Sequence, residues 1–312
     1  MTEEGARGGT RGSPTPIGVP RFELGTSPTR TERATRLRHT PSAHRVPARR
    51  TRAPWLASPG PLYTVLVAGR DEIVAYANAL LDVERWPEFA PPGLQVSGGS
   101  EVALLACGVS SSRTLFERAA AEGADMVLVH HGLFWRNEPL VIDGRQRGRL
   151  EALFNANASL LAYHLALDAH PTLGNAAQLA ARIGASPEGP FGSVGLACTL
   201  DGLSIAALTE RVTEAVDREP LVFASGPDRI ERLAVSTGAA GYDLIRAAHE
   251  GFDALLTGEP EEPNLATAEE LGIHLIAAGH HATERFGVQA LAAHLAEKFA
   301  IEWRYLEVEN PV

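Results

Sequence analysis

The feature that most constrains this chain is a regular alternation of apolar strands and helical segments from residue 101 onward. The run EVALLACGV at 101–109 is typical of a buried strand. It is followed by SSRTLFERAAAEG at 111–123, which opens with Ser and Thr, ends with Gly and has helical spacing. The same order repeats to the end of the chain. Strands that alternate with helices favour an α/β fold with substantial parallel pairing.

The expected elements can be given by residue range. Helices are expected at 71–86, 111–123, 147–157, 175–185, 203–217, 242–250, 266–271 and 283–298, the last of them amphipathic. Strands are expected at 101–109, 125–129, 160–165, 190–199, 232–238, 254–258, 273–279 and 302–308. Catalytic loops of such folds lie at the carboxyl ends of the strands, so the polar residues found there are the candidates for chemistry.

The first 62 residues have a different composition. They hold 11 Arg, no Lys and 4 Glu, together with 9 of the 21 Pro, and they show neither strand nor helix periodicity. We expect a disordered Arg- and Pro-rich leader over 1–64, because such a segment buries too little apolar surface to offset its ordering entropy. Two alternatives stay open: an Arg-rich arm for nucleic acid, and a gene start placed too early, so that residues 1–62 are not translated.

The rest of the chain is acidic. It holds 17 basic and 34 acidic residues, a net charge of −17, which makes nucleic acid an unlikely partner. No apolar run approaches the roughly 20 residues that span a bilayer, and the N-terminus lacks a signal-peptide core, so no membrane association is expected. Cys107 and Cys198 are isolated in apolar contexts, which favours reduced core thiols and a cytoplasmic location.

The first cluster of polar residues follows the strand predicted at 125–129. His130 and His131 come directly after it, and Gly132 permits a tight turn beside them. Because neighbouring side chains of an extended segment point to opposite faces, such a pair can reach two different metal ions.

The second and third clusters also follow predicted strands. His164, Asp168 and His170 lie in the segment HLALDAHP, where Asp168 is either a turn residue or a hard oxygen ligand. His280 and Glu284, in GHHATE, are four residues apart, so both can face one point if a helix has begun there.

Together the three clusters offer a mixed set of nitrogen and oxygen donors without thiolate. This suits Zn, Mn, Fe or Co with open positions for water, and two carboxylates among five residues suit two metals with one carboxylate bridging them. Glu259, in Thr257-Gly258-Glu259, is a further acid at a strand end, either a turn residue or a group that supports the site. No nucleophile elbow, P-loop or HExxH helix occurs.

The segments HHGLFW, HLALDAHPTLGN, TGE and GHHATE, in this order, resemble the Nif-three-like dinuclear metal-centre hexameric family, also named the GTP cyclohydrolase 1 type 2 family. The likeness covers about residues 71–310 and fits the short form of the family. The resemblance implies a Nif-three-like fold of two α/β lobes with mixed sheets and a metal site in the cleft between them. We therefore expect one lobe over 65–195 plus 279–312 and a second lobe over 196–278.

The resemblance also implies a site and an assembly. Two divalent metal ions would be held by five ligands, with Glu284 bridging, and the chains would form a homohexamer, a trimer of dimers. The ligands carried over are His130, His131, Asp168, His280 and Glu284.

These observations favour a metal-dependent hydrolase in which a metal-activated water attacks a C–N or P–O bond of a GTP-like small molecule. His164, His170 and Glu259 are the predicted groups for proton transfer or for support of the ligands. The alternative is a metal-binding regulatory or metal-chaperone protein without turnover, which would need the same ligands. A ring that encloses nucleic acid is disfavoured by the acidic charge.

Overall fold

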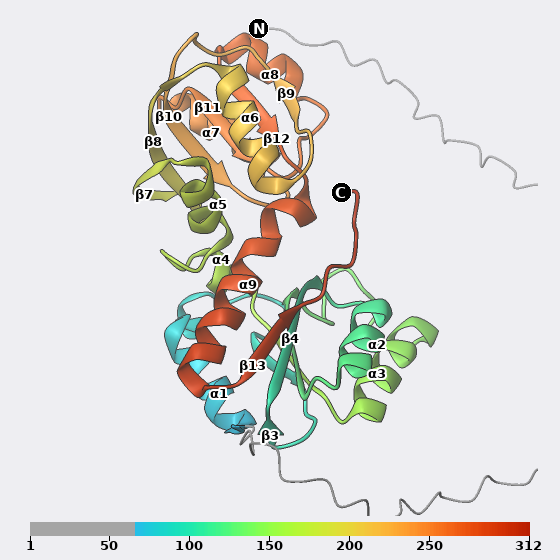
Figure 1. Cartoon of the computed structure of the whole chain (residues 1–312). Helices are drawn as coiled ribbons and strands as arrows, with labels where there is room; N and C mark the ends of the chain where they lie inside the picture. The colour runs from blue at the N-terminus through green and yellow to red at the C-terminus, as the bar shows by residue number, and fades with distance from the viewer. Residues whose placement is uncertain (1–65) are drawn as a thin grey trace, which may run out of the picture. The chain divides into compact units, whose positions relative to one another are not determined.

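The computed structural model describes residues 66–312, and Figure 1 shows their helices and strands in chain order. The leader expected over 1–64 lies outside these residues, so its predictions remain untested. The described residues form one structural unit. None of the helices in the described range is long and apolar enough to cross a membrane.

The first of two large sheets has five strands. Its strand order is β13-β4-β5-β6-β2, with β13, β4, β5 and β6 parallel and β2 antiparallel at the edge. Its strands are β2 (Gly93–Val96), β4 (Leu104–Ser110), β5 (Met126–His131), β6 (Ser159–Ala162) and β13 (Glu302–Tyr305), and a short ribbon pairs β1 (Ala68–Gly69) with β3 (Glu101–Val102).

The second large sheet has six strands. Its order is β7-β8-β10-β11-β12-β9, with β10, β11 and β12 parallel and the other pairs antiparallel. The strands are β7 (Ser186–Phe191), β8 (Gly195–Leu203), β9 (Leu221–Phe223), β10 (Ile230–Ser236), β11 (Ala254–Thr257) and β12 (His274–Ala277). The expectation of an α/β fold with mixed sheets is confirmed.

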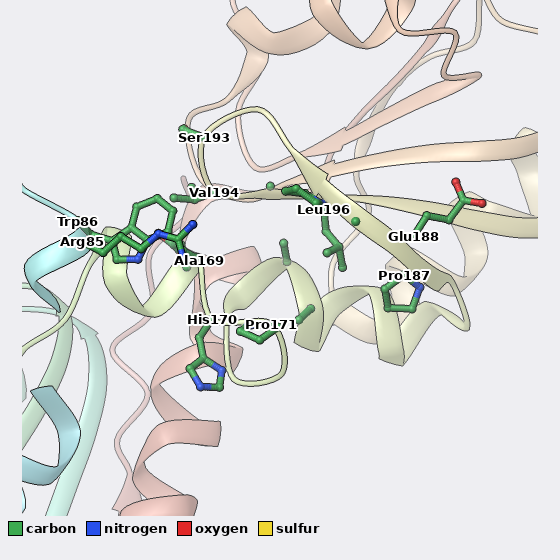
Figure 2. Close-up of a pocket in the computed structure, with 16 residues that line it drawn as sticks. Arg85, Trp86, Ala169, His170, Pro171, Pro187, Glu188, Ser193, Val194 and Leu196 are labelled. Carbon is green, nitrogen blue, oxygen red and sulfur yellow. The ribbon is translucent and has the colours of Figure 1, made fainter. Parts of the chain in front are cut away.

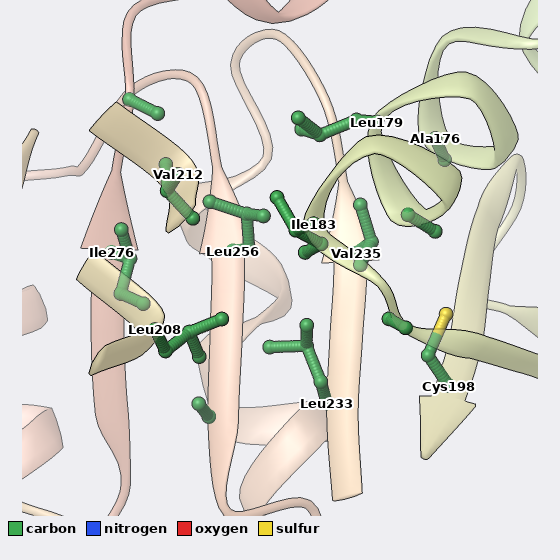
Figure 3. Packing of buried hydrophobic residues seen from close by; sticks show 14 of the residues in the cluster. Ala176, Leu179, Ile183, Cys198, Leu208, Val212, Leu233, Val235, Leu256 and Ile276 are labelled. Carbon is green, nitrogen blue, oxygen red and sulfur yellow. The ribbon is translucent and has the colours of Figure 1, made fainter. Parts of the chain in front are cut away.

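Helices pack on both faces of each sheet. They are α1 (Arg70–Leu80), η1 (Val83–Arg85), α2 (Arg113–Glu122), α3 (Gly144–Ala156), α4 (Leu165–Asp168), α5 (Asn175–Ile183), α6 (Ile205–Val216), η2 (Gly241–Asp243), α7 (Leu244–His249), α8 (Asn264–Leu271) and α9 (His280–Phe299). On the five-stranded sheet, α1 and α9 cover one face, and α2 and α3 the other. On the six-stranded sheet, α5 and α6 cover one face, and α7 and α8 the other. Figure 3 shows the α5 and α6 side, where Leu179 and Val212 pack over Val235 and Leu256.

Helix α9 joins the two hydrophobic cores. Its first turns place Ala282 and Phe286 in the core of the six-stranded sheet, and later turns place Leu291 and Leu295 in that of the five-stranded sheet. Buried residues therefore lie around most of its circumference. The prediction of an amphipathic helix over 283–298 was wrong in two respects: the helix begins at His280, and it has no single apolar face, because it packs against two sheets in succession.

One further prediction needs correction. The expected strand at 190–199 is a hairpin of β7 and β8, joined at 192–194, so that the six-stranded sheet begins at Ser186. The division into two lobes stays a prediction. The edge strand β9 was missed because its three residues lie in a segment without alternation.

Candidate metal centre

The two adjacent histidines lie on strand β5 itself, which runs through His131 instead of ending at residue 129. His130 is fully buried, and its ring centroid lies 4.8 Å from that of His131. The Nε2 atoms of both rings approach one carboxylate: His130 Nε2 is 3.7 Å from Glu284 Oε1, and His131 Nε2 is 3.0 Å from Glu284 Oε2. The strand thus directs its two imidazoles to the two oxygens of a single side chain.

The first turn of α9 supplies the carboxylate and a third imidazole. Because α9 begins at His280, this residue and Glu284 share one helix face, and His280 Nε2 lies 2.9 Å from Glu284 Oε2. The conditional expectation that both would face one point is confirmed. Glu284 is buried, 4% exposed, so its negative charge must be stabilised by these imidazoles or by a bound cation.

Asp168 approaches the same group from the end of α4. Its Oδ2 lies 3.3 Å from His130 Nε2. Its other oxygen, Oδ1, accepts a hydrogen bond of 2.8 Å from Nδ2 of the fully buried Asn175 at the start of α5. Asn175 Oδ1 in turn accepts the backbone N–H of Gly287 at 2.7 Å. This chain of bonds fixes Asp168 so that only Oδ2 faces the imidazoles.

Each of the three histidines is held by its other ring nitrogen. His130 Nδ1 donates to the Tyr163 carbonyl at 2.9 Å, and His280 Nδ1 donates to Glu259 Oε1 at 2.5 Å. His131 Nδ1 forms a 3.0 Å hydrogen bond with Ser110 Oγ. Since a carbonyl or carboxylate only accepts, Nδ1 carries the proton of the neutral ring in His130 and in His280, and Nε2 of that neutral form has the lone pair that can bind a metal. Metal-binding histidines are commonly oriented in this way.

Within the described residues, two buried atoms of the cluster have no hydrogen-bond partner. They are His130 Nε2 and Glu284 Oε2. A buried polar atom without a partner costs about 1–3 kcal/mol, so their position at the centre of the cluster requires an explanation. A divalent cation between imidazole nitrogen and carboxylate oxygen satisfies both. The donor set of buried His and Glu groups therefore fits metal ions, and the group of His131, His280 and Glu284 has the spacing for one.

The cluster shifts the pKa values of its members. Burial lowers the pKa of His130, but the Asp168 and Glu284 carboxylates outweigh this and raise it well above the usual value. Burial lowers the pKa of His131. For His280, burial lowers the pKa and the Glu284 and Glu259 carboxylates raise it by more. Burial raises the pKa of Glu284, whereas His130 above all holds it well below the usual value.

The three residues predicted to transfer protons differ in how they contact the cluster. His164 reaches the cluster, with its ring centroid 4.9 Å from that of His130. Glu259 contacts it through His280, so it orients this imidazole. His170 Nδ1 accepts the backbone N–H groups of Thr172 and Leu173, so it stabilises the turn before α5, and no contact found among residues 66–312 joins it to the cluster. Proton transfer by these side chains stays a prediction.

Two other histidines near the motifs have partners elsewhere. His281 Nε2 donates to Glu307 Oε1 at 2.6 Å, and His274 bonds to the loop at Gly226 and Pro227.

Several supporting residues were not found from the sequence. Ser110 ends β4, and Glu88 lies in the irregular segment between η1 and β2, where no periodicity marks it. Asn175 had one available signal, because it directly follows Gly174 at the start of a predicted helix. Its hydrogen bond with Asp168 could be identified only from the structure.

A cavity of about 450 Å³ lies beside Asp168. Figure 2 shows Trp86 and Arg85 on one side and Val194 and Leu196 of the β7–β8 region on the other. The Arg85 guanidinium lies 5.7 Å from the Trp86 ring centroid. The volume is within the range of small-molecule sites.

Comparisons with known proteins give matches over most of the chain. A family model described as Duf34/NIF3 (NGG1p interacting factor 3) matches residues 68–311. A protein of Pseudomonas aeruginosa named GTP cyclohydrolase 1 type 2 homolog is 42% identical over 245 residues, which cover 77% of this chain and 97% of the relative. A relative of the same name from Allochromatium vinosum is also 42% identical, over 77% of this chain and 96% of its own length.

Solved structures give the same result for the fold. The protein ybgI, described as of unknown function, has a TM-score of 0.76 and 37% identity, covering 78% of this chain and all of its own. The protein TTHA1606 from Thermus thermophilus has a TM-score of 0.74 and 34% identity, with the same coverage. The resemblance inferred from the motifs is confirmed.

Proposed function

The chain belongs to the Duf34/NIF3 family, and on that premise we propose that it binds two divalent metal ions and acts as a metal-dependent hydrolase. One observation carries the proposal. Three imidazoles from β5 and α9 direct Nε2 at the two oxygens of Glu284, and a buried nitrogen and a buried oxygen at the centre have no partner.

The contacts divide the five ligands into two groups that share Glu284. His130 and Asp168 lie on the side of Oε1, whereas His131 and His280 lie on the side of Oε2. Each group then provides three protein donors and leaves room for water or substrate, as catalytic sites do. Zn, Mn, Fe and Co all accept such donors.

When bound, a pair of divalent cations lowers the pKa of water and stabilises negative charge on a reacting oxygen. The chain's own residues prepare the site for this. Tyr163, Ser110 and Glu259 fix the imidazole orientations, and Asn175 fixes Asp168. The Glu259 side chain is 37% exposed, so the carboxylate that holds His280 is also accessible to a proton from a substrate.

The proposed substrate is a GTP-like small molecule, a proposal supported by the name of the relatives and by the cavity beside Asp168. Indole and guanidinium groups such as those of Trp86 and Arg85 can stack on a planar base or pair with phosphate. The buried and unpaired thiols of Cys107 and Cys198 support the proposed cytoplasmic location.

The test is to purify the full chain, load it with Mn, Zn or Fe, and assay GTP and phosphoesters. We expect two metals per chain and hydrolysis that a chelator abolishes. Glu259→Gln should still bind both metals when they are supplied at saturating concentration, and it should lose activity. Metal-loaded protein that is inert with every substrate would favour the alternative, a metal-binding regulatory or chaperone protein, because both functions use the same ligands.

A further inference from the structure

A second carboxylate–imidazole pair lies against the cluster of His, Asp and Glu side chains and is not one of the five proposed ligands. His164 Nδ1 donates to Glu88 Oε2 at 2.8 Å. The Glu88 side chain is 9% exposed and the His164 side chain is 28% exposed. This repeats the arrangement of Glu259 and His280, in which a carboxylate holds Nδ1 and leaves Nε2 free.

The His164 ring lies at the same site as the other imidazoles. One ring nitrogen each of His130, His131 and His164 lies within 4.8 Å of the others. His130 and His131 have their Nδ1 atoms engaged, so each has one nitrogen left, and that nitrogen already faces Glu284. The three imidazoles therefore cannot form a separate third site. His164 can only add a donor to the existing centre.

We propose that His164 is a sixth ligand of this centre, binding through Nε2 the cation held by His130, and that Glu88 is its positioning residue. The proposal rests on the proposed metal centre. His130 is the nearer of the two β5 histidines, with a centroid distance of 4.9 Å from His164 against 5.5 Å for His131. Two nitrogens on one ion are at most about 4.2 Å apart, twice a bond of about 2.1 Å, so a small ring rotation closes the gap.

The burial of Glu88 is an independent argument. Among residues 66–312, its Oε1 is buried without a hydrogen-bond partner, and its other oxygen bonds only to His164. The residues that line the small void beside it include His130, Gln95 and Trp135, but no Lys or Arg. A buried carboxylate needs a nearby positive charge, and a cation bound to His164 provides one through the imidazole.

This assignment replaces the proton transfer predicted for His164. An imidazole that donates Nδ1–H to Glu88 and binds a cation through Nε2 has no nitrogen left to exchange a proton. The ion beside His130 would then have two imidazole and two carboxylate donors, whereas the ion beside His131 would keep three protein donors.

The experiment is a Co²⁺ titration of the metal-free full chain, followed by visible absorption and calorimetry, since the absorption of Co²⁺ reports its ligands. The variants are His164→Ala, Glu88→Gln and, as a matched control, His249→Ala, which removes an exposed histidine at the end of α7. Circular dichroism checks that each variant is folded.

For wild type and His249→Ala we expect two binding events with the same spectra. In His164→Ala one event should weaken by at least about 10- to 100-fold with a changed spectrum while the other is kept, and Glu88→Gln should weaken the same event by less. If His164→Ala binds two Co²⁺ with wild-type affinity and spectrum, the sixth ligand is refuted while the metal centre stands. If wild type binds no Co²⁺, the metal centre itself is refuted.

Discussion

Gly238 lies directly against the Glu284 carboxylate, so that a Cβ at this position would overlap Oε1. The loop after β10 thereby closes over the shared carboxylate, and the Gly238 N–H is bound by Thr283 Oγ1 of the same helix turn at 3.1 Å. Glycine is also required by the backbone, because φ is +68°. The position of Glu284 thus depends on the absence of a side chain on a neighbouring loop.

Gly238→Ala should therefore displace Glu284 and abolish tight metal binding, besides a backbone strain of about 1–2 kcal/mol. Gly123→Ala is the matched control, since Gly123 also has a positive φ, +75°, but no atom lies within 4 Å of the added Cβ. Metal analysis and thermal unfolding of both variants separate the effects. Metal retained in Gly238→Ala would show that the loop does not constrain Glu284.

Glu284→Gln and Asp168→Asn should differ in metal content. Glu284 faces imidazoles of both groups, whereas His130 has the one imidazole of residues 66–312 that pairs with Asp168. We expect Glu284→Gln to lose both cations and Asp168→Asn to retain one, because a neutral amide cannot replace a shared carboxylate. Metal content after gel filtration measures this. Equal loss in both variants would contradict the division into two groups.

Asn175→Ala should weaken binding of the cation beside Asp168 by about 10- to 100-fold, because Asp168 Oδ1 and the Gly287 N–H lose their partner. Two unsatisfied buried groups also cost about 1–3 kcal/mol each in stability. Ser159→Ala is the control: Ser159 is buried, and its Oγ accepts the Gly98 N–H at the start of β6, the strand end opposite to the cluster. It should lose stability and keep metal affinity, as measured by calorimetry.

Metal affinity should rise with pH. The raised pKa of His130 means that the metal-free protein keeps a proton on this ring above pH 6.5, and a cation must displace it. In the metal-free protein, the stability due to protonated His130 is present below the unfolded pKa and is lost as pH rises through the folded pKa. Metal should therefore raise the Tm more at pH 8.5 than at pH 6. An increase independent of pH would contradict this reading of His130.

The sequence predicted the fold class, most elements and the residues that converge, because the five lie on or shortly after strands β5, β6 and β12. It could not predict what holds them. The bond from Asn175 to Asp168 and the contact of Gly238 with Glu284 join residues far apart in the chain. The same limit explains the misplaced start of α9. A helix buried between two cores lacks the apolar stripe by which amphipathic helices are identified.

The homohexamer implied by the family resemblance leads to a last prediction. Between β5 and α3 the chain exposes a run of apolar side chains: Leu140 is 84% exposed, Val141 63% and Ile142 73%, near the partly exposed Phe134 and Trp135. Monomeric proteins rarely expose contiguous apolar patches of this kind, so contact with a second copy would explain it.

A full-length chain has a mass of 33.2 kDa. We expect gel filtration with light scattering to give a mass of about 200 kDa, which corresponds to six copies. Ile142→Glu should reduce this mass, because a charge buried in an interface without a partner costs several kcal/mol. Glu122→Lys, a charge change at the exposed end of α2, is the control and should assemble normally. An Ile142→Glu protein that retains the wild-type mass would show that this segment lies outside the interface.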